Sequence, residues 1–141
     1  MIRRIQIFLA EDNPGDIELV REALREHHIE YNLAIASDGA EVKRFIESLG
    51  SNDVRCPDLV LLDLNLPKAH GYELFEMLRA HEGCEEIPVI VVTSSSAPKD
   101  RERAVELGAA RYFRKPSELD EFLRLGSVVR ELAIERGLMA A

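Results

Sequence analysis

Five segments of the chain have the hydrophobic pattern of a β-strand. Residues 5–9, 59–62 and 89–92 are almost continuously apolar, residues 31–36 alternate weakly, and residues 112–113 are an aromatic pair. A short, continuous apolar run is typical of a strand that is buried on both faces of a sheet. The pattern therefore predicts five strands, of which the third and fourth are covered on both sides.

Each predicted strand is followed by a segment whose apolar residues recur at helical spacing. Asn13-Pro14, Ser37-Asp38-Gly39, Gly71 and Ser117 mark helix starts, and Gly108 marks the end of the fourth helix. The residues expected to face the core are Ile17, Val20, Ala23 and Leu24 in the first helix; Val42, Phe45, Ile46 and Leu49 in the second; Leu74, Met77 and Leu78 in the third; and Leu119, Phe122, Leu123, Val129 and Ala133 in the last.

Strands that alternate with helices form a parallel sheet with right-handed crossovers and helices on both faces. The chain has 141 residues, enough for one domain with a sizeable core. We expect an α/β fold of the flavodoxin-like, doubly wound type, with five parallel strands in the order 2-1-3-4-5. We expect this domain to occupy residues 1–141 with no fused output domain, and we expect a polar loop at residues 50–57.

The last predicted helix, residues 117–136, carries more apolar residues than one core-facing stripe requires. Leu125, Val128 and Leu132 also recur at helical spacing, away from the centre of the stripe described above. A second apolar stripe is often an interaction surface. We therefore predict a homodimer that uses this helix together with the fourth helix and the fifth strand. The alternative is a wide stripe that packs entirely on the sheet.

Composition and charge argue against several classes of function. The formal net charge of -8 opposes nucleic acid as the main partner, because phosphate binding needs a basic patch. No apolar stretch approaches the ~18 residues that span a bilayer, and the chain start lacks a signal-peptide pattern, so we expect no membrane partner. Cys56 and Cys84, without a CxxC motif, are most simply two reduced thiols of a cytoplasmic protein.

Polar residues that can do chemistry follow four of the predicted strands. Glu11 and Asp12 follow the first strand, Asp63 the third, Thr93 the fourth and Lys115 the fifth. The carboxyl ends of parallel strands meet at one edge of the sheet, so we expect these side chains to lie together. Three crowded carboxylates repel one another, and a hard divalent cation such as Mg²⁺ relieves that repulsion.

These residue types suit the transfer of a phosphoryl group. Thr93 offers a hydroxyl donor and Lys115 a compact positive charge, so the carboxylate of Asp63 is the natural nucleophile and would form an aspartyl phosphate. Catalysis would come from alignment and charge neutralisation. Each residue alone also fits an ordinary turn, cap or surface position. Their joint arrangement at successive strand ends favours a site.

Four short motifs carry a resemblance to a known family. They are Glu11-Asp12-Asn13, Leu62-Asp63-Leu64-Asn65-Leu66-Pro67, Thr93-Ser94, and Tyr112-Phe113-Arg114-Lys115-Pro116. Together they make the chain resemble a response-regulator receiver domain of the chemotaxis-regulator type, from residue 5 to about residue 136. The combination is highly specific, although each motif alone is weak.

The resemblance implies a metal-assisted phosphoacceptor. Asp63 would accept the phosphoryl group. Asp12 and Asp63 would bind Mg²⁺, or Mn²⁺, together with the backbone carbonyl of Asn65, and Glu11 would act largely through water. By the same resemblance, family members catalyse only their own phosphotransfer and dephosphorylation, so the chain is expected to be a signalling protein rather than an enzyme.

The resemblance also implies a switch and a set of partners. Lys115 would contact the phosphoryl oxygens, Thr93 would hydrogen-bond one of them, and Tyr112 matches the aromatic switch position. The chain would be a stand-alone response regulator of a two-component phosphorelay. A histidine kinase would phosphorylate Asp63, and the aspartyl phosphate would change a surface that contacts an unknown downstream protein.

Two features place the chain within this family more closely. The Asn13-Pro14-Gly15-Asp16 turn and the long loop before Pro57 resemble the receivers that partner phytochrome-type histidine kinases. His70 stands where an Asp is usual, and because this position lies beyond the metal ligands we expect a turn or surface role for it. The other histidines show no metal-binding spacing and are His27, His28 and His81.

Two other classes of function share part of this pattern. A phosphatase of the haloacid-dehalogenase type also uses an Asp nucleophile with Mg²⁺, but it needs a second Asp two residues later, where this chain has Asn65. A receiver-like binding module that is never phosphorylated typically lacks the acidic pair or the acceptor, and this chain keeps both. A stable adduct on Asp63 would distinguish the receiver from both alternatives.

Overall fold

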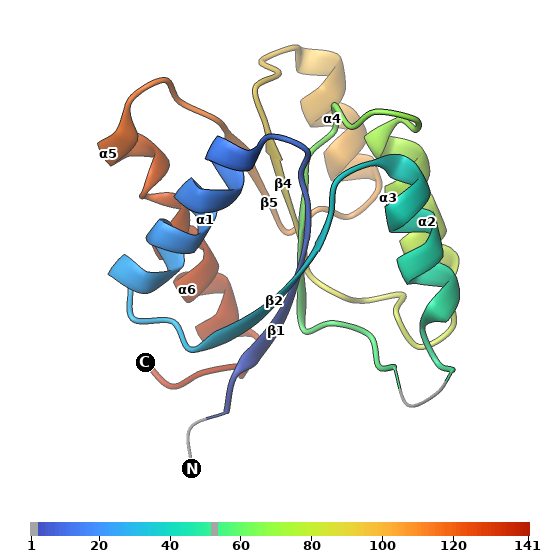
Figure 1. The fold of residues 1–141 in the computed structure, drawn as a ribbon, viewed down its shortest axis with the longest axis horizontal. Helices are drawn as coiled ribbons and strands as arrows, with labels where there is room; N and C mark the ends of the chain where they lie inside the picture. Colours follow the sequence, from blue (N-terminus) through green and yellow to red (C-terminus); the bar gives the residue numbers. More distant parts are fainter. Residues whose placement is uncertain (1–2, 52–53) are drawn as a thin grey trace.

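Strands and helices alternate along the chain in the computed structural model, which describes residues 3–51 and 54–141 (Figure 1). The strands are β1 (Ile5–Ala10), β2 (Tyr31–Ala36), β3 (Leu59–Leu62), β4 (Val89–Thr93) and β5 (Arg111–Arg114). The helices are α1 (Pro14–Glu26), α2 (Gly39–Ser48), α3 (Gly71–Ala80), α4 (Pro98–Glu106), α5 (Leu119–Phe122) and α6 (Leu125–Glu135). All strand pairs are parallel, and the order is β2-β1-β3-β4-β5, which confirms the predicted fold.

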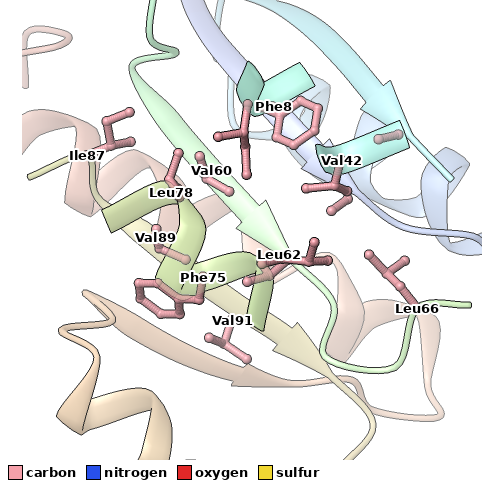
Figure 2. Close-up of a cluster of buried hydrophobic side chains, with 14 of the residues drawn as sticks. Phe8, Val42, Val60, Leu62, Leu66, Phe75, Leu78, Ile87, Val89 and Val91 are labelled. Carbon is pink, nitrogen blue, oxygen red and sulfur yellow. The ribbon is translucent and has the colours of Figure 1, made fainter. Parts of the chain in front are cut away.

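The sheet separates two hydrophobic cores. Helices α1, α5 and α6 cover one face, and α2, α3 and α4 cover the other (Figure 1). Successive residues of a strand point to opposite faces, so Val60 and Leu62 enter the core of Figure 2 while Leu59 and Leu61 enter the other core. Strand β3 is therefore buried on both faces, as its continuous apolar run predicted.

Local side-chain caps begin three of the helices at the predicted places. The backbone N–H of Asp16 donates to the side-chain oxygen of Asn13 at 3.0 Å, and Pro14 occupies the first turn of α1. Asp38 caps α2 in the same way. His70 caps α3, because its Nδ1 accepts from the backbone N–H of Tyr72 at 3.2 Å, which confirms the turn role expected of this histidine.

The last helix differs from the prediction. It is two helices, and Glu118 rather than Ser117 is the residue before the first. The backbone N–H groups of Arg124, Gly126 and Ser127 each donate to a carbonyl three residues earlier. A turn tightened in this way has about three residues per turn instead of 3.6, which rotates the apolar face of everything after it.

This rotation changes which residues face the core. Leu125 and Leu132, which the sequence placed on a second stripe, are fully buried, and Val128 is half-buried. Leu119, expected in the core, is 56 % exposed. The second stripe was therefore the wrong interpretation, and the wide stripe that packs on the sheet is correct. Of the three residues predicted to form a dimer surface, Val128 alone is still outside the core.

One further difference lies in α3. Phe75 was not among the residues expected to face the core, yet it is fully buried in the cluster of Figure 2. Of the polar loop predicted at residues 50–57, residues 52–53 lie outside the described residues.

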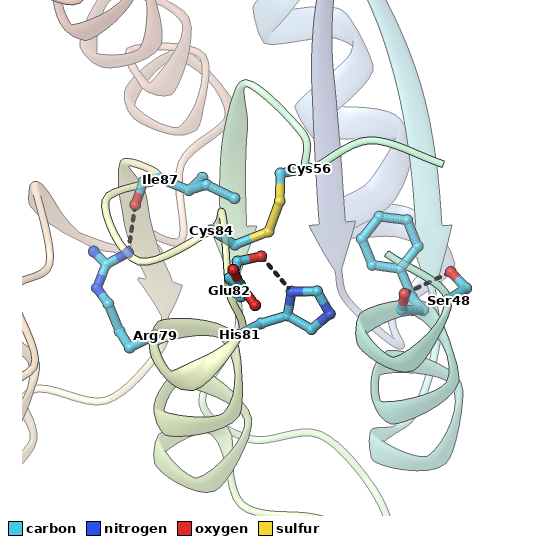
Figure 3. Close-up of a disulfide and its surroundings, with 8 residues drawn as sticks. Ser48, Cys56, Arg79, His81, Glu82, Cys84 and Ile87 are labelled. Carbon is cyan, nitrogen blue, oxygen red and sulfur yellow. Dashed lines mark hydrogen bonds between the residues drawn. A yellow bond between two sulfur atoms is a disulfide. The ribbon is translucent and has the colours of Figure 1, made fainter. Parts of the chain in front are cut away.

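The cysteines contradict the prediction of two reduced thiols. Cys56 lies just before β3, Cys84 lies in the loop between α3 and β4, and the two form a disulfide (Figure 3). Their Cα atoms are 5.9 Å apart, within the usual range for a disulfide. Local sequence patterns do not indicate this pairing, because the two residues are 28 positions apart and meet only when β3 and β4 pair.

Candidate phosphoacceptor site

The register of the sheet brings the predicted site residues to one edge. Ala10 pairs with Leu62, so the residues that follow them, Glu11 and Asp63, leave adjacent strands side by side. The backbone N–H of Asp63 donates to the carbonyl of Ala10 at 3.0 Å. We call this edge, where the strands have their C-terminal ends, the carboxyl edge.

Lys115 is at the centre of the carboxyl edge. Its Nζ lies 2.7 Å from Glu11 Oε1, 2.8 Å from Asp16 Oδ2 and 2.8 Å from Asp63 Oδ2. Its backbone N–H also donates to the carbonyl of Thr93 at 2.7 Å, which joins the end of β5 to the end of β4. One ammonium group therefore holds three carboxylates from three different parts of the chain.

Asp63 is fixed on both of its carboxylate oxygens. Oδ2 accepts from Lys115, and Oδ1 accepts from the backbone N–H of Asn65 at 2.9 Å. The side-chain amide of Asn65 donates to Thr93 Oγ1 at 3.3 Å. The side chains of Asp63 and Thr93 are both buried, so these contacts are shielded from bulk water and are stronger for it.

A close backbone approach supports the loop that holds Asn65. The N–H of Gly71 donates to the carbonyl of Leu64 at 3.1 Å. A Cβ atom at position 71 would lie 2.5 Å from the Cα of Leu64, nearer than real Cβ atoms come. Only glycine allows α3 to begin so close to this loop, which explains Gly71 at the start of the helix.

Burial changes the ionisation of the central groups. Glu11 is 1 % exposed, and burial raises its pKa to about 7 although Lys115 opposes the shift. Burial alone would lower the pKa of Lys115, but its hydrogen bonds to Asp16, Asp63 and Glu11 outweigh burial and raise that pKa. The lysine therefore stays protonated, while Glu11 is the group that titrates near neutral pH.

The acidic residues fit a divalent cation. Oxygen atoms of Glu11, Asp12 and Asp63 all lie within 4.8 Å of one another. Asp12 is exposed, whereas the other two are buried, so the cluster opens to solvent on one side only. Carboxylate oxygens with room for water are the ligands that Mg²⁺ and Mn²⁺ accept.

Ser95 joins the two predicted switch residues. Its backbone N–H donates to Thr93 Oγ1 at 3.3 Å, and its carbonyl accepts from the hydroxyl of Tyr112 at 3.0 Å. Tyr112 is half-buried, and burial raises the pKa of its hydroxyl. The guanidinium of Arg101 lies 5.1 Å from the centre of the Tyr112 ring, a cation–π distance.

The same loop is tied to two helices. Asp100, in the first turn of α4, accepts from the hydroxyl of Ser95. The hydroxyl of Tyr72, on α3, contacts Asp100 Oδ1 at 3.0 Å and donates to its backbone carbonyl at 2.6 Å. A displacement of the loop that carries Ser95 would therefore affect α4, α3 and Tyr112.

Sequence reasoning missed two residues of this site. Asp16 was seen only as part of a turn, but its carboxylate contacts Lys115 as closely as Asp63 does. Its position three residues after the Asn13 cap, on the first turn of α1 and facing the strand ends, was the available signal. Ser95 was missed because its two main contacts are made by backbone atoms, which carry no residue-specific pattern.

Comparison with known families agrees with this geometry. The family model for the response regulator receiver domain matches residues 7–125 of the chain. The chain belongs to the response regulator receiver domain family. Its five-stranded order is therefore that of a receiver, and the function that the sequence predicted is that of phosphorylation-dependent signalling proteins.

Several relatives match this receiver over most of their length. The response regulator Rcp1 of Synechocystis sp. is 33 % identical over 131 residues, which cover 92 % of this chain and 88 % of that protein. A crystal structure of the phosphorylated cyanobacterial phytochrome response regulator RcpA is 32 % identical with a TM-score of 0.82, and the match covers 92 % of this chain and 94 % of that one.

A second structure is relevant to the metal. The Mn²⁺-bound form of Rcp1 is 31 % identical with a TM-score of 0.81, over 93 % of this chain and 95 % of that one. Divalent metal binding therefore occurs within the relatives of this receiver. Among the described residues, the helices are all too short or too polar to cross a membrane.

Proposed function

We propose that this receiver accepts a phosphoryl group on Asp63 from a histidine kinase and acts as a stand-alone response regulator. The observation that carries the proposal is the contact of one half-buried ammonium, Lys115, with Glu11, Asp16 and Asp63 beside the buried hydroxyl of Thr93. The stand-alone role is supported by Rcp1, most of whose length the chain covers.

The transfer uses groups that are already in place. A carboxylate oxygen of Asp63 forms the new bond to phosphorus while the bond from phosphorus to the kinase histidine nitrogen breaks, and the electron pair of that bond returns to the imidazole. Lys115 balances the charge on the phosphoryl oxygens. Thr93 Oγ1 accepts two N–H bonds, from Asn65 and Ser95, so its own hydrogen is available for a phosphoryl oxygen.

We propose Mg²⁺ as the physiological metal, with Mn²⁺ as a substitute. Glu11, Asp12, Asp63 and the backbone carbonyl of Asn65 would hold it, and when bound it would neutralise negative charge during the transfer. The closely spaced carboxylate oxygens support this assignment. Loss of phosphorylation in excess chelator is the expected result, and phosphorylation that persists in chelator would contradict it.

Thr93 and Tyr112 would convert phosphorylation into a change of surface. The Thr93 hydroxyl is drawn toward the phosphoryl group, because a charge-assisted hydrogen bond is stronger than a neutral one. That movement pulls on Ser95, which accepts from Tyr112, so the ring would leave its present position and fill the vacated space. Crystals with and without beryllofluoride test this, and identical Tyr112 rotamers would refute it.

The proposed partners follow from the relatives and from the charge. A phytochrome-type histidine kinase in the cytoplasm is the proposed donor, because RcpA is a phytochrome response regulator and RtBRR is a bacteriophytochrome response regulator. An unidentified protein, rather than nucleic acid or membrane, would read the switched surface. The formal net charge of -8 supports this choice.

Homodimerisation through the last helix is kept as a separate prediction. Its remaining support is the half-buried Val128, since Leu125 and Leu132 are inside the core. Light scattering at high micromolar concentration, with and without beryllofluoride, decides it. A dimer that is lost in Val128→Glu supports the prediction, and a monomer mass in both conditions refutes it.

The test of the proposed function is phosphorylation by acetyl phosphate with Mg²⁺, followed by mass spectrometry. We expect one phosphoryl group per chain on Asp63, and none on Asp63→Asn, whose amide lacks the nucleophilic oxygen. Asp58→Asn is the matched control, because Asp58 lies at the opposite end of the same strand and contacts Arg3. This variant should be labelled like the wild type.

The two alternative functions give different results in the same assay. Multiple turnover of unrelated phosphate esters would favour a phosphatase of the haloacid-dehalogenase type. No adduct under any condition would favour a binding module. Full labelling of Asp63→Asn would show that the acceptor is elsewhere.

A further inference from the structure

The disulfide Cys56–Cys84, drawn in Figure 3, lies near the starts of β3 and β4, whereas the proposed phosphoacceptor lies at their C-terminal ends. Cys56 comes three residues before Leu59, where β3 begins, and Cys84 lies in the loop that leads to Val89, where β4 begins. We call this the amino edge. Nothing in the proposed phosphoryl transfer uses these two residues.

The two sulfur atoms differ in their access to solvent. Cys84 is fully buried, whereas Cys56 is half-buried. A hollow of about 410 Å³ adjoins Cys56, and polar groups line part of it. Among its lining residues Arg55 is exposed and carries a positive charge, the carboxylate of Asp58 is paired with Arg3, and Gln6 and Asn32 offer amides. Cys56 is therefore the cysteine that adjoins this hollow, whereas Cys84 is closed to solvent.

The compartment in which this receiver would work indicates what kind of disulfide this is. This step rests on the proposed function, because a receiver that partners a cytoplasmic histidine kinase works where thiols are kept reduced. Disulfides that form in such a compartment are usually transient and redox-sensing. Partly exposed disulfides are also the more easily reduced ones.

We propose that Cys56 and Cys84 form a reversible thiol–disulfide exchange site for low-molecular-weight anionic thiols of the glutathione class, with Cys56 as the sulfur that reacts first. The Cys56 thiolate attacks oxidised glutathione, forms a mixed disulfide and releases one glutathione thiolate. The Cys84 thiolate then attacks the Cys56 sulfur and releases the second. Two cysteine thiols are oxidised to one disulfide, and one oxidised glutathione is reduced to two glutathione thiols, which take up the two protons.

His81 lies beside the two cysteines, so the test must distinguish thiol–disulfide exchange from metal binding. A ring nitrogen of His81 and both sulfur atoms lie within 4.8 Å of one another. Its Nδ1 lies 3.0 Å from the backbone carbonyl of Glu82, which can only accept, so Nδ1 carries the hydrogen and Nε2 is left with a lone pair (Figure 3). Two thiolates and an imidazole are ligands that Zn²⁺ prefers.

The exchange test uses the full chain, reduced and then exposed to about a hundredfold excess of oxidised over reduced glutathione. Intact mass spectrometry should show the wild type losing two hydrogen atoms, and reduced glutathione at millimolar concentration should reverse this. Cys84→Ser should retain one glutathionyl group on Cys56. Cys56→Ser should remain unmodified, because the sulfur of Cys84 is buried. Circular dichroism of each variant distinguishes loss of folding from loss of exchange. Cys56→Ala and Cys84→Ala are measured in the same way as a second pair of variants.

Three results would overturn the proposal. A wild type that stays reduced in the oxidising buffer, or that cannot be reduced by glutathione, is not an exchange site. Equal glutathionylation of both single variants would contradict the assignment of Cys56 as the sulfur that reacts first. One tightly held Zn²⁺ per reduced chain, lost in His81→Asn and protective against oxidation, makes the cluster a metal site instead. None of these measurements depends on phosphorylation, so a failure of the proposed function would be seen separately.

Discussion

The two ends of strands β3 and β4 are held together by different physical means. At the carboxyl edge, Asp63 and Thr93 are joined through Asn65 and Lys115 by hydrogen bonds and ion pairs. At the amino edge, a covalent bond links the segments that lead into the same two strands. One edge can exchange its partners when a ligand arrives, whereas the other can change only by a redox reaction.

The energetic consequences of the two edges are opposite. Burying several carboxylates around one ammonium is expensive, because desolvation consumes most of the Coulomb energy. A disulfide instead lowers the entropy of the unfolded chain and so stabilises the fold. The comparison predicts that the amino edge increases the free energy of unfolding. The carboxyl edge lowers it, because its buried charges are arranged to bind a metal and a phosphoryl group.

Removal of the disulfide should have the largest effect on stability. The double variant Cys56→Ser/Cys84→Ser loses a crosslink between residues 28 positions apart. The free energy of unfolding should fall by about 3.5 kcal/mol on loop-entropy grounds. Urea unfolding of the oxidised wild type and the variant measures the difference. Equal midpoints and slopes would mean that the amino edge does not carry the stability assigned to it.

Glu11 should make stability depend on pH in the metal-free receiver. Its pKa is raised by burial from 4.5 to about 7, so between these values the folded state binds more protons than the unfolded state. The free energy of unfolding should therefore fall as the pH rises from about 4.5 to about 7, by on the order of 3 kcal/mol. Glu11→Gln cannot titrate and should lack this decline. Urea unfolding of both proteins in chelator at several pH values tests it, and parallel curves would contradict the assignment.

Asp12→Ala should weaken metal binding with little effect on folding. Asp12 is the exposed member of the acidic cluster, so its loss removes a ligand and a negative charge without leaving a cavity. We expect the Mg²⁺ dissociation constant to rise by about a hundredfold. Isothermal titration calorimetry measures it, and Asp120→Ala, which removes an exposed carboxylate on α5, is the control. Equal affinities in both variants would place the metal elsewhere.

Tyr112→Phe should have the smallest effect. It removes one hydrogen bond, from the Tyr112 hydroxyl to the carbonyl of Ser95, and leaves the ring in place. The free energy of unfolding should fall by about 1 kcal/mol. The Asp63 labelling rate with acetyl phosphate should change less than about threefold, because the hydroxyl does not contact the acceptor carboxylate. A complete loss of labelling would mean that the hydroxyl acts in the transfer itself.

Local patterns were enough to predict most of the fold and the carboxyl edge. Strands such as Leu59–Leu62 are specified by neighbouring residues, and a parallel sheet then gathers whatever follows each strand. Glu11, Asp63, Thr93 and Lys115 were found in this way, and the structure brings them together.

The features that were missed depend on distant or backbone contacts. The disulfide needs the pairing of β3 with β4, and Asp16 meets Lys115 across 99 positions of sequence. Leu119 and Leu125 were assigned to the wrong faces because a tightened turn between α5 and α6 shifts the helical phase. An ideal period of 3.6 residues cannot reveal such a local change.

The contacts of Ser95 have a consequence for how this receiver can vary among related sequences. Thr93 and Tyr112 are linked through the N–H and carbonyl of Ser95, which nineteen of the twenty amino acids supply equally and only proline lacks in part. In the part of the chain that the structure describes, its hydroxyl donates to Asp100 and accepts from the backbone N–H of Ala97. Mutational drift at position 95 can therefore alter how the signal reaches α4 while the connection between the two switch residues is inherited unchanged.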